Sequence, residues 1–243
     1  NFEEILVKTS KVSGFLLNKK DITSKQSFIR GDWWVQDFSS FFPIHNLLEK
    51  SKDKKFLDAC SAPGGKSFQL LSKNLNVTLN DKSKSRIEIL KSNLRRLKFS
   101  PQIFNKDFTK FSESDKYDCI IIDAPCSALG TIRKNPEIFF KNKGPNFKDL
   151  NSLQEDMLEK ASALLNQNGF IIYMVCSFLK NETIDQINKF LKKNSNFFLL
   201  DFTLTKEQSN YSKLIKKNFM ITLPDNILNN SIDGYFAACL EKK

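Results

Sequence analysis

Two cysteines stand where runs of apolar residues end, and these positions suggest chemistry before any other part of the chain. Cys126 follows Asp123 in YDCIIIDAPCS, and Cys176 closes the apolar run in GFIIYMVCS. A thiolate can form a covalent intermediate with its substrate and later leave again, so cysteine serves as a covalent catalyst. Many cysteines are only small core residues. Two thiols at matching places, one of them near a carboxylate, favour a chemical role.

The other cysteines and the histidine suggest no competing site. The five cysteines show no C-x-x-C spacing, which predicts free thiols and neither a disulfide framework nor a metal site. Cys119 and Cys239 lie inside apolar runs and are expected in the core. His45 is the only histidine, and we expect it to be structural or solvated.

A glycine-containing turn and two later acidic residues suggest a cofactor site. The turn CSAPGGK (60–66) follows a short apolar run and precedes a helical segment, so its backbone N–H groups can approach a ligand. It fits neither G-x-G-x-x-G nor the Walker pattern. Asp81 is placed to bind a ribose diol, and Asp107 to lie near an adenine edge. Either acid alone is more often a helix N-cap, but with the turn they favour a nucleotide-like cofactor.

Strand-like and helix-like segments alternate from Lys55 onward. The predicted strands are 55–60, 76–81, 101–107, 117–125 and 170–177. One intervening helix carries apolar residues from Leu150 to Leu164 and is expected to close at NQNG (166–169). Two further strand-like runs, 196–202 and 233–242, have no helix between them. The pattern predicts a doubly wound α/β fold, with a mostly parallel sheet and an antiparallel strand near the C-terminus.

Ligands of such sheets bind at the carboxyl ends of the strands. This rule places on one rim the segment 58–66, Asp81, Asp107, the segment 123–127 and Cys176.

Composition and charge limit the function classes. The chain has 243 residues, 40% of them hydrophobic, which is enough for one large domain. Its net charge of +11 favours a nucleic-acid partner. No apolar run approaches the roughly 18 residues of a membrane helix, so we expect a cytoplasmic protein without a membrane partner. Residues 1–27 are predicted to be a linker or the end of a preceding module, and 28–243 the main domain.

Four segments resemble the signature segments of the Sun-type RNA (cytosine-5) methyltransferases. They are LDACSAPGGKS, DAPCSALGTIRKNPEI, YMVCSFLKNE and DGYFAACLEK. The resemblance runs in order from about Gly31 to the C-terminus and includes GDWWVQD. It implies a Rossmann-like methyltransferase domain, an RNA substrate with ribosomal RNA preferred, and an RNA-binding module that ends near residue 27. We also expect a monomer.

The resemblance also implies roles for individual residues. S-adenosyl-L-methionine would be held by the turn, with Asp81 on the ribose, Asp107 near the adenine and Asp123 at the methionine end. Cys176 would be the nucleophile, and Cys126 the second cysteine that helps to release the product. Asp123 has an alternative role, a hydrogen bond to the base. The residues of the turn are Cys60, Ser61, Ala62, Pro63, Gly64, Gly65 and Lys66.

The implied reaction explains why two thiols are wanted. Cytosine C5 is a poor nucleophile, and a thiolate that adds to C6 makes C5 able to attack a sulfonium methyl group. The enzyme must then remove the C5 proton and eliminate the thiol, so a second group is needed near C5. Cys126 has the right neighbourhood if its strand is adjacent to the strand of Cys176.

The loop after Cys126 is basic and aromatic, and we predict that it contacts phosphates and bases beside the site. The alternative is a solvated loop with its phenylalanines packed underneath. The residues concerned are Arg133, Lys134, Lys141, Lys143 and Lys148, with Phe139, Phe140 and Phe147.

The sequence departs from the family pattern at Ala128, where glycine is usual, and at Val175 and Thr183. Ala128 matters if that position needs a positive φ. Other functions stay open: a tRNA or a DNA cytosine-5 methyltransferase, and a catalytically inactive RNA-binding or ribosome-assembly factor. A DNA enzyme is expected to take its nucleophile from the Pro-Cys segment and to carry Glu-Asn-Val, which is absent.

Overall fold

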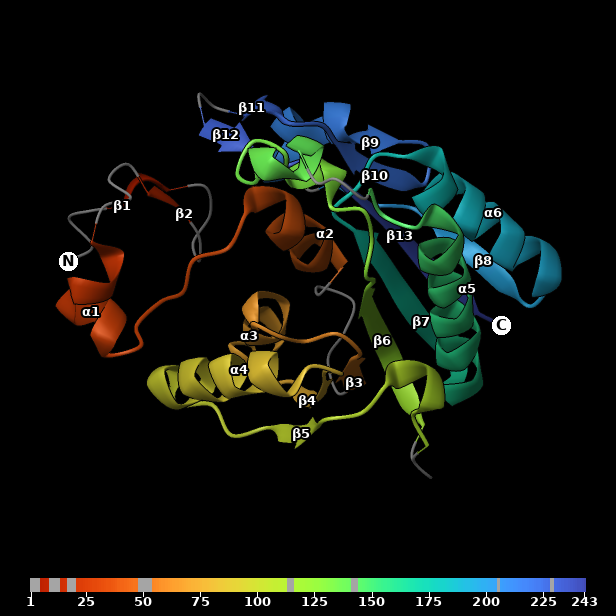
Figure 1. Cartoon of the computed structure of the whole chain (residues 1–243), viewed down its shortest axis with the longest axis horizontal. Coiled ribbons are helices and arrows are strands. Elements are labelled where there is room, and N and C mark those ends of the chain that lie inside the picture. The colour runs from red at the N-terminus through yellow and green to blue at the C-terminus, as the bar shows by residue number, and fades with distance from the viewer. Residues whose placement is uncertain are drawn as a thin grey trace.

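A nine-stranded sheet forms the centre of the computed structural model shown in Figure 1. The structure describes residues 5–8, 14–16, 21–47, 54–112, 116–140, 144–204, 206–227 and 230–243. The strand order is β5-β4-β3-β6-β7-β13-β10-β9, and β8 pairs with β13. The strands are β3 (Lys55–Asp58), β4 (Asn76–Asn80), β5 (Gln102–Phe104), β6 (Tyr117–Asp123), β7 (Leu165–Val175), β8 (Phe197–Leu200), β9 (Ile215–Lys216), β10 (Phe219–Thr222) and β13 (Tyr235–Lys242).

The strand directions confirm the predicted fold class. β5, β4, β3, β6 and β7 pair in parallel, and β13 is antiparallel to β7, β8 and β10. The order reverses at β3, which lies between β4 and β6, as it does in doubly wound sheets. The carboxyl ends of the parallel strands therefore meet at one edge of the sheet.

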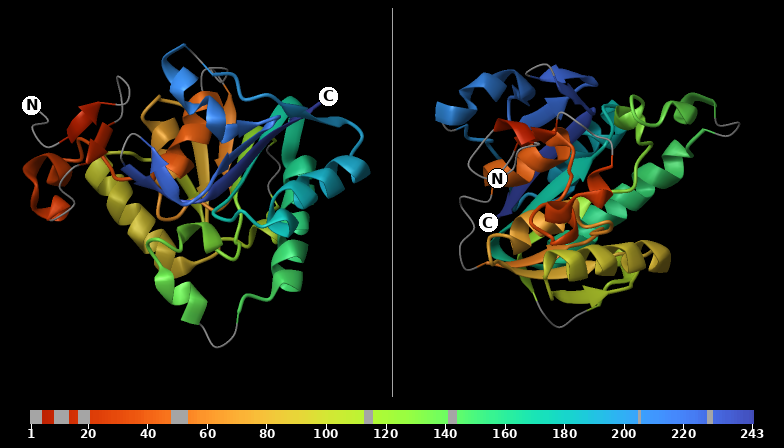
Figure 2. Two further views of the ribbon diagram at one scale, coloured as in Figure 1. Left: turned by 90° about the horizontal axis from the view of Figure 1, so that it is seen from above. Right: turned by 90° about the vertical axis from the view of Figure 1, so that its left-hand side faces the viewer.

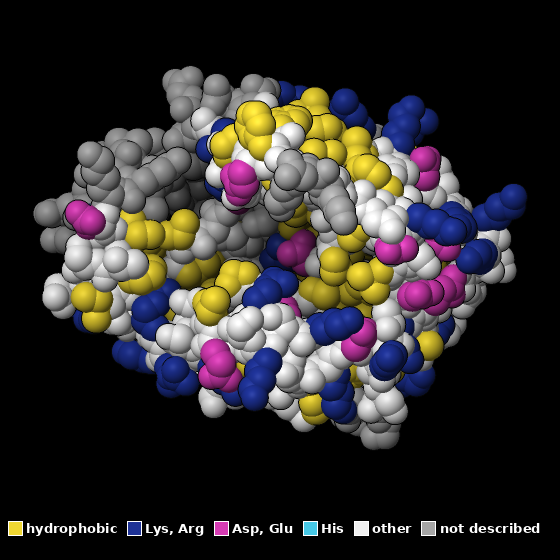
Figure 3. Space-filling view, in the orientation of Figure 1, with side chains coloured by type: hydrophobic (Ala, Val, Ile, Leu, Met, Phe, Trp, Pro, Cys, Tyr) yellow, Lys and Arg dark blue, Asp and Glu magenta, His cyan; other side chains and the backbone are white. Residues whose placement is uncertain are grey.

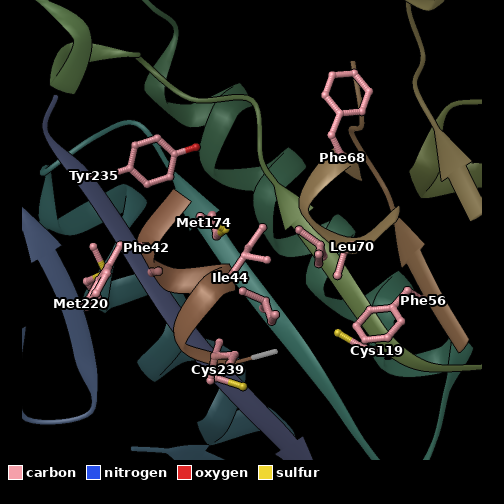
Figure 4. Packing of buried hydrophobic residues seen from close by; sticks show 14 of the residues in the cluster. Phe42, Ile44, Phe56, Phe68, Leu70, Cys119, Met174, Met220, Tyr235 and Cys239 are labelled. Carbon is pink, nitrogen blue, oxygen red and sulfur yellow. The ribbon is translucent and has the colours of Figure 1, made fainter. Parts of the chain in front are cut away.

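Helices cover both faces of this sheet. One core cluster joins α2 (Phe38–Leu47), α3 (Gly65–Leu71) and α4 (Lys84–Leu97) to the sheet, and Figure 4 shows part of it. The other cluster includes α5 (Phe147–Leu164) and α6 (Ile184–Lys193). In Figure 2, left, α4 lies on one side of the sheet and α5 with α6 on the other.

The run of isoleucines in β6 is explained by this double cover. Ile121 packs in the cluster of α2 to α4, whereas Ile120 and Ile122 pack in the cluster of α5 and α6. All three side chains have no exposed surface. Full burial of such a side chain stabilises the fold by about 1.5–3 kcal/mol, so both faces of a central strand select apolar residues.

The end of α5 differs from the prediction. The helix ends at Leu164, and NQNG lies inside β7, which begins at Leu165. The turn-forming residues make an irregularity in the strand: Asn168 has φ +59°, and the β6–β7 register shifts between Tyr117 and Cys119. Asparagine and glycine mark a break in regular structure, and here the break lies in a strand.

The other described elements lie outside this nine-stranded sheet. Two of them, β1 and β2, form an antiparallel pair of their own. The predicted domain boundary between residues 27 and 28 falls inside α1, so the division into domains stays a prediction. These elements are β1 (Ile5–Lys8), β2 (Gly14–Leu16), η1 (Ile22–Ser24), α1 (Gln26–Ile29), η3 (Phe108–Lys110), η4 (Leu129–Thr131), η5 (Pro136–Phe140), η6 (Lys180–Glu182), η7 (Lys206–Leu214), β11 (Asp225–Ile227) and β12 (Asn230–Ile232).

Candidate functional site

The glycine turn after β3 leaves no room for a side chain at Gly64. Gly64 has φ +122°, and a Cβ atom there would lie 2.0 Å from the ring of Phe68. Gly65 begins α3, so the turn leads directly into a helix N-terminus. The Ser61 N–H bonds the Asn80 carbonyl at the end of β4. The predicted turn thus lies on the rim, with its N–H groups at the start of a helix.

Cys60 is the thiol of the turn itself. Burial, together with Asp123 and Asp58, raises the pKa of this thiol far above its usual range. Cys60 therefore stays protonated and is not a candidate nucleophile.

Asp81 ties the turn to the end of β4. Its side chain is buried, Oδ2 accepts from the Ala62 N–H at 3.1 Å, and Oδ1 accepts from the Ser83 N–H at 2.9 Å. The guanidinium of Arg86 lies 3.7 Å from Oδ2. A carboxylate oxygen has more than one acceptor position, so the predicted bond to a ribose stays compatible with these contacts.

Asp107 has the helix-cap arrangement that the sequence left open. Its Oδ1 accepts from the Thr109 backbone N–H at 3.1 Å and caps η3, and Oδ2 lies 2.7 Å from Lys82 Nζ. Hydrogen bonds from Lys82 and Thr109 hold the pKa of Asp107 below its usual value. The contact with an adenine remains a prediction for this residue.

Asp123 ends β6 and is held by two side chains. Lys66 Nζ lies 2.7 Å from Oδ2, and the Tyr235 hydroxyl donates to Oδ1. The ammonium of Lys66 also lies 5.3 Å from the centre of the Tyr235 ring. Burial, then Asp123, raises the pKa of Tyr235 well above its usual value, so the phenol remains a donor.

Tyr235 belongs to the site although no role was predicted for it. It lies in DGYFAACLEK, one of the segments that carry the family resemblance. Its partner Asp123 is 112 positions away in the sequence, and only the antiparallel strand β13 brings the two together. The resemblance of the segment is the signal that points to it.

Cys126 and Cys176 meet beside this group. Their sulfur atoms are 3.4 Å apart, because β6 and β7 are adjacent and parallel and each thiol follows its strand. The hydrogen bond with Cys176, together with burial, raises the pKa of Cys126 well above its usual value. This shift favours the protonated form of Cys126.

The loop after Cys126 packs through its backbone against two other segments. The Gly130 N–H bonds the Cys176 carbonyl at 2.9 Å, and the Gly234 N–H bonds the Gly130 carbonyl at 2.8 Å. A Cβ atom on Gly130 would lie 1.9 Å from the Gly234 oxygen. Ala128 has φ +58°, so this position does adopt the conformation that favours glycine.

The start of the basic loop is tied to the protein. Arg133 Nη2 lies 2.9 Å from Asp233 Oδ1, and Lys134 Nζ bonds Asp37 and Asp233 at 2.5 and 2.6 Å. Burial opposes ionisation of Asp37, but the bond from Lys134 holds the pKa of this carboxyl below its usual value. Two aspartates thus pair with both basic residues, and contact of Arg133 and Lys134 with phosphates stays a prediction.

The aromatic part of the loop is exposed. Phe139 and Phe140 on η5 are 67% and 80% exposed, so the alternative of phenylalanines packed underneath is wrong. Phe147 is 36% exposed, and Lys148 is exposed. Lys141 and Lys143 lie outside the described residues. In the space-filling view, charged side chains lie in a hollow near the centre of the molecule, bordered by hydrophobic ones (Figure 3).

Asp58 is a buried carboxylate at the end of β3. Oδ2 accepts from the Ser67 hydroxyl at 2.6 Å, whereas Oδ1 has no hydrogen-bond partner among the described residues. Burial raises the pKa of Asp58 to about 6, although the bond from Ser67 and the charge of Lys66 oppose the shift.

Two further expectations concern metals and membranes. In the described ranges, no three His, Cys, Asp or Glu side chains gather as a metal site. None of the helices in the same ranges is long and apolar enough to cross a membrane. His45 stacks on Phe41 in α2, with ring centres 5.0 Å apart, as expected of a structural residue.

Comparison with known proteins decides the family. A family model described as 16S rRNA methyltransferase RsmB/F matches residues 45–241. The chain belongs to the RsmB/F family. The resemblance that the four segments suggested is thereby confirmed, and membership of a methyltransferase family supports S-adenosyl-L-methionine as the cofactor.

Curated members of the RsmB/F family are similar over most of the chain. The ribosomal RNA small subunit methyltransferase B of Photorhabdus laumondii is 32% identical over 227 residues, which are 91% of this chain and 50% of that protein. The protein of the same name from Pasteurella multocida is 31% identical over 93% of this chain and 51% of its own length. The chain thus spans about half the length of these relatives.

Solved structures show the same fold. The crystal structure titled PH0851 has a TM-score of 0.82 and 25% identity, and covers 99% of this chain and 54% of that one. NSun6 from Pyrococcus horikoshii, crystallised with SFG, has a TM-score of 0.76 at 23% identity over 91% of this chain and 56% of its own.

The left-handed conformation of Ala128 predicts a stabilising substitution. We expect Ala128→Gly to raise the free energy of unfolding by about 1 kcal/mol, because φ +58° is strained for any residue with a Cβ atom. Urea denaturation measures the change. The same substitution within α5, Ala161→Gly, is the control and should destabilise by about 1 kcal/mol or more. An Ala128→Gly variant that is less stable than the natural chain contradicts the prediction.

The raised pKa of Asp58 predicts a pH dependence of stability. The folded state keeps the proton up to about pH 6, whereas the unfolded carboxyl loses it near its usual pKa of 3.8. Stability should therefore fall as pH rises through this window, by about 3 kcal/mol, relative to Asp58→Asn. Urea denaturation of both proteins at several pH values between 4 and 7 measures the difference.

A second substitution controls for this interpretation. Because the bond from Ser67 lowers the pKa of Asp58, Ser67→Ala should move the step to higher pH. Parallel stability curves for the natural chain and Asp58→Asn would show that another group titrates.

Proposed function

We propose that this chain transfers a methyl group from S-adenosyl-L-methionine to C5 of a cytidine in RNA. The proposed substrate is ribosomal RNA of the small subunit, and the product is 5-methylcytosine. The reaction passes through a covalent bond between Cys176 and C6 of the base. The observation that carries the proposal is the pair of sulfur atoms, 3.4 Å apart, at the ends of two adjacent strands.

The residues of the rim fit the cofactor. A turn without room for a Cβ atom at Gly64, followed by a helix N-terminus, suits the close approach of a nucleoside. Asp81 and Asp107 would bind the ribose and the adenine, and Asp123 would lie at the methionine end. When bound, the cofactor supplies a methyl group on a positively charged sulfur, which carboxylates on this rim can attract.

Asp123 fits a positioning role at the cofactor end better than a direct bond to the base. Lys66 and Tyr235 already occupy one acceptor position on each of its two oxygens. The pair fixes the carboxylate and partly neutralises it. These contacts favour the first of the two roles that the sequence left open.

Cys176 performs the covalent step. Its thiolate adds to C6, and the electron pair of the C5–C6 double bond moves to C5, which takes the methyl group. In the release step, Cys126 gives its proton to the departing sulfur of Cys176 and takes up the C5 proton in its place. The electron pair of the C–H bond restores the C5–C6 double bond as the bond from Cys176 to C6 breaks.

The exposed phenylalanines of η5 suit RNA. An aromatic ring on the surface stacks on an unpaired base, and each such contact contributes about 1–3 kcal/mol. Phe139 and Phe140 are the most exposed large apolar side chains among the described residues. Together with the net charge of +11 they support an RNA surface beside the thiols.

A catalytically inactive RNA-binding factor is the competing function. It would not need two thiols in contact beside an anchored carboxylate, and this arrangement favours the enzyme. A tRNA substrate is less favoured, since the family model names 16S rRNA. A monomer without a metal, and an RNA-binding module before residue 28, belong to the same proposal.

Substitution of each thiol tests the proposed mechanism. We expect Cys176→Ala to abolish transfer of a labelled methyl group to small-subunit ribosomal RNA, because no thiolate adds to C6. We expect Cys126→Ala to accumulate a protein–RNA adduct that survives denaturation, because release is impaired. Gel electrophoresis under denaturing conditions detects the adduct.

Cys239→Ala is the control, since that thiol is buried in β13 within the core. It should retain transfer without an adduct. An adduct in Cys176→Ala but not in Cys126→Ala would reverse the two roles, and full activity of Cys176→Ala would defeat the proposal.

Substitution of the aromatic pair tests the RNA surface. Phe139→Ala combined with Phe140→Ala should raise KM for RNA about tenfold or more, because two stacking contacts are lost. KM for S-adenosyl-L-methionine should not change. Phe198→Ala, which removes a phenylalanine that is 44% exposed on β8, is the matched control. An equal rise in KM for RNA in the control would show that any loss of exposed apolar surface has this effect, and would contradict the prediction.

A further inference from the structure

A buried carboxylate binds the residues that directly follow both thiols. Glu182, at the end of η6, has no exposed surface. Its Oε1 accepts from the Ser127 N–H at 2.8 Å, and its Oε2 accepts from the hydroxyls of Ser127 and Ser177, both at 2.6 Å. A fourth donor, Gln154 Nε2, lies 3.4 Å from Oε1.

The two serines are the immediate neighbours of the two thiols. Ser127 follows Cys126, and Ser177 follows Cys176. Their hydroxyl oxygens lie 3.3 Å apart, about as close as the two sulfur atoms. One carboxylate thus holds the chain directly after each cysteine.

Glu182 is itself held in place. The Tyr173 hydroxyl donates to the Glu182 carbonyl at 2.8 Å, and the Glu182 N–H bonds the Leu179 carbonyl at 3.1 Å. Gln154 also donates to the Pro125 carbonyl at 2.9 Å, on the other side of Cys126. A carboxylate that is held from several sides keeps one position, and it therefore fixes the positions of the groups that bind to it.

We propose that Glu182 is a positioning residue that sets the distance between Cys126 and Cys176 through Ser127 and Ser177. A carboxylate suits this role because it accepts from several donors at once, and charge-assisted bonds are stronger than neutral ones. Loss of the acceptor leaves buried donors without partners, so the two turns would separate or rearrange. The link to methyl transfer rests on the proposed function, but the link to thiol distance does not.

A dithiol reagent tests the geometry without RNA or cofactor. Phenylarsine oxide bridges two close thiols and releases one water molecule, and intact-protein mass spectrometry counts the adduct. We expect the natural chain to bind it through Cys126 and Cys176, and Cys126→Ala to lose this binding. Glu182→Ala should bind at least about tenfold more weakly, since the sulfurs are no longer held together.

Glu182→Gln is the conservative variant. Its amide oxygen accepts from the Ser127 N–H, and its NH₂ group donates to the serine hydroxyls, which can turn to accept. Arsenical binding should therefore stay within about threefold of the natural chain. The control Asp118→Asn changes a carboxylate at the opposite end of β6 that accepts from Lys55 N and Asn166, and it should leave binding unchanged.

The serine variants separate the two thiols during catalysis. Ser177→Ala should slow formation of the RNA adduct, and Ser127→Ala should accumulate it. Glu182→Ala should lower kcat about tenfold to a hundredfold with KM for the cofactor unchanged, because misplacement by about 1 Å can cost that much.

Each outcome bears on the proposal. Arsenical binding by Glu182→Ala within twofold of the natural chain overturns it, as does an equal loss in Asp118→Asn. If Glu182→Ala does not fold, Ser127→Ala combined with Ser177→Ala decides, because it removes the two hydroxyl donors to Glu182: arsenical binding within twofold of the natural chain then overturns the proposal. An inactive natural chain that still binds the arsenical would defeat the proposed function and leave the role of Glu182 testable.

Discussion

The parallel pairing of β6 with β7 is the constraint on which the rest of the site depends. Asp123 pairs with Met174, and the hydrogen bond from the Ala124 N–H to the Met174 carbonyl continues the pairing beyond the strand. Because side chains alternate along a strand, a slip by one residue would exchange the faces of the whole run. The register of β6 and β7 brings together two thiols that are distant in the sequence. The contacts of the following loops then adjust a distance between the sulfur atoms that the strand pairing has already made short.

The segments that contain Cys176, Gly234 and Asp37 then hold the loop that follows Cys126. Gly130 packs backbone to backbone against Gly234, and Lys134 bridges Asp37 and Asp233. Burial raises the pKa of Asp233, the bond from Lys134 opposes the shift, and Asp37 adds to it. The ion pairs therefore fix a position more than they add stability, since partly buried pairs lose much of their attraction to desolvation.

Local patterns in the sequence predict the features that depend on neighbouring residues. Strands and helices follow from apolar periodicity, and strand ends place the glycine turn and Asp81 on one rim. The contacts of Tyr235 and Glu182 join residues that are distant in the sequence, and no spacing in the sequence predicts them. NQNG misleads because asparagine and glycine break a strand as readily as they end a helix. The ion pairs of Arg133 and Lys134 could not be predicted because their acidic partners are distant in the sequence, and charge alone does not show which cations are paired.

Three carboxylates near this rim differ in the partners that satisfy their oxygen atoms. Asp58 has an oxygen without a partner, and its pKa is raised to about 6. Asp123 is balanced by Lys66 and Tyr235, and Glu182 by donors from both thiol turns. The charge of Glu182 adds to the rise in the pKa of Cys126, whose largest cause is the bond with Cys176. Because Glu182 is the smallest of these causes, its main part at the sulfur pair is to hold the two turns together.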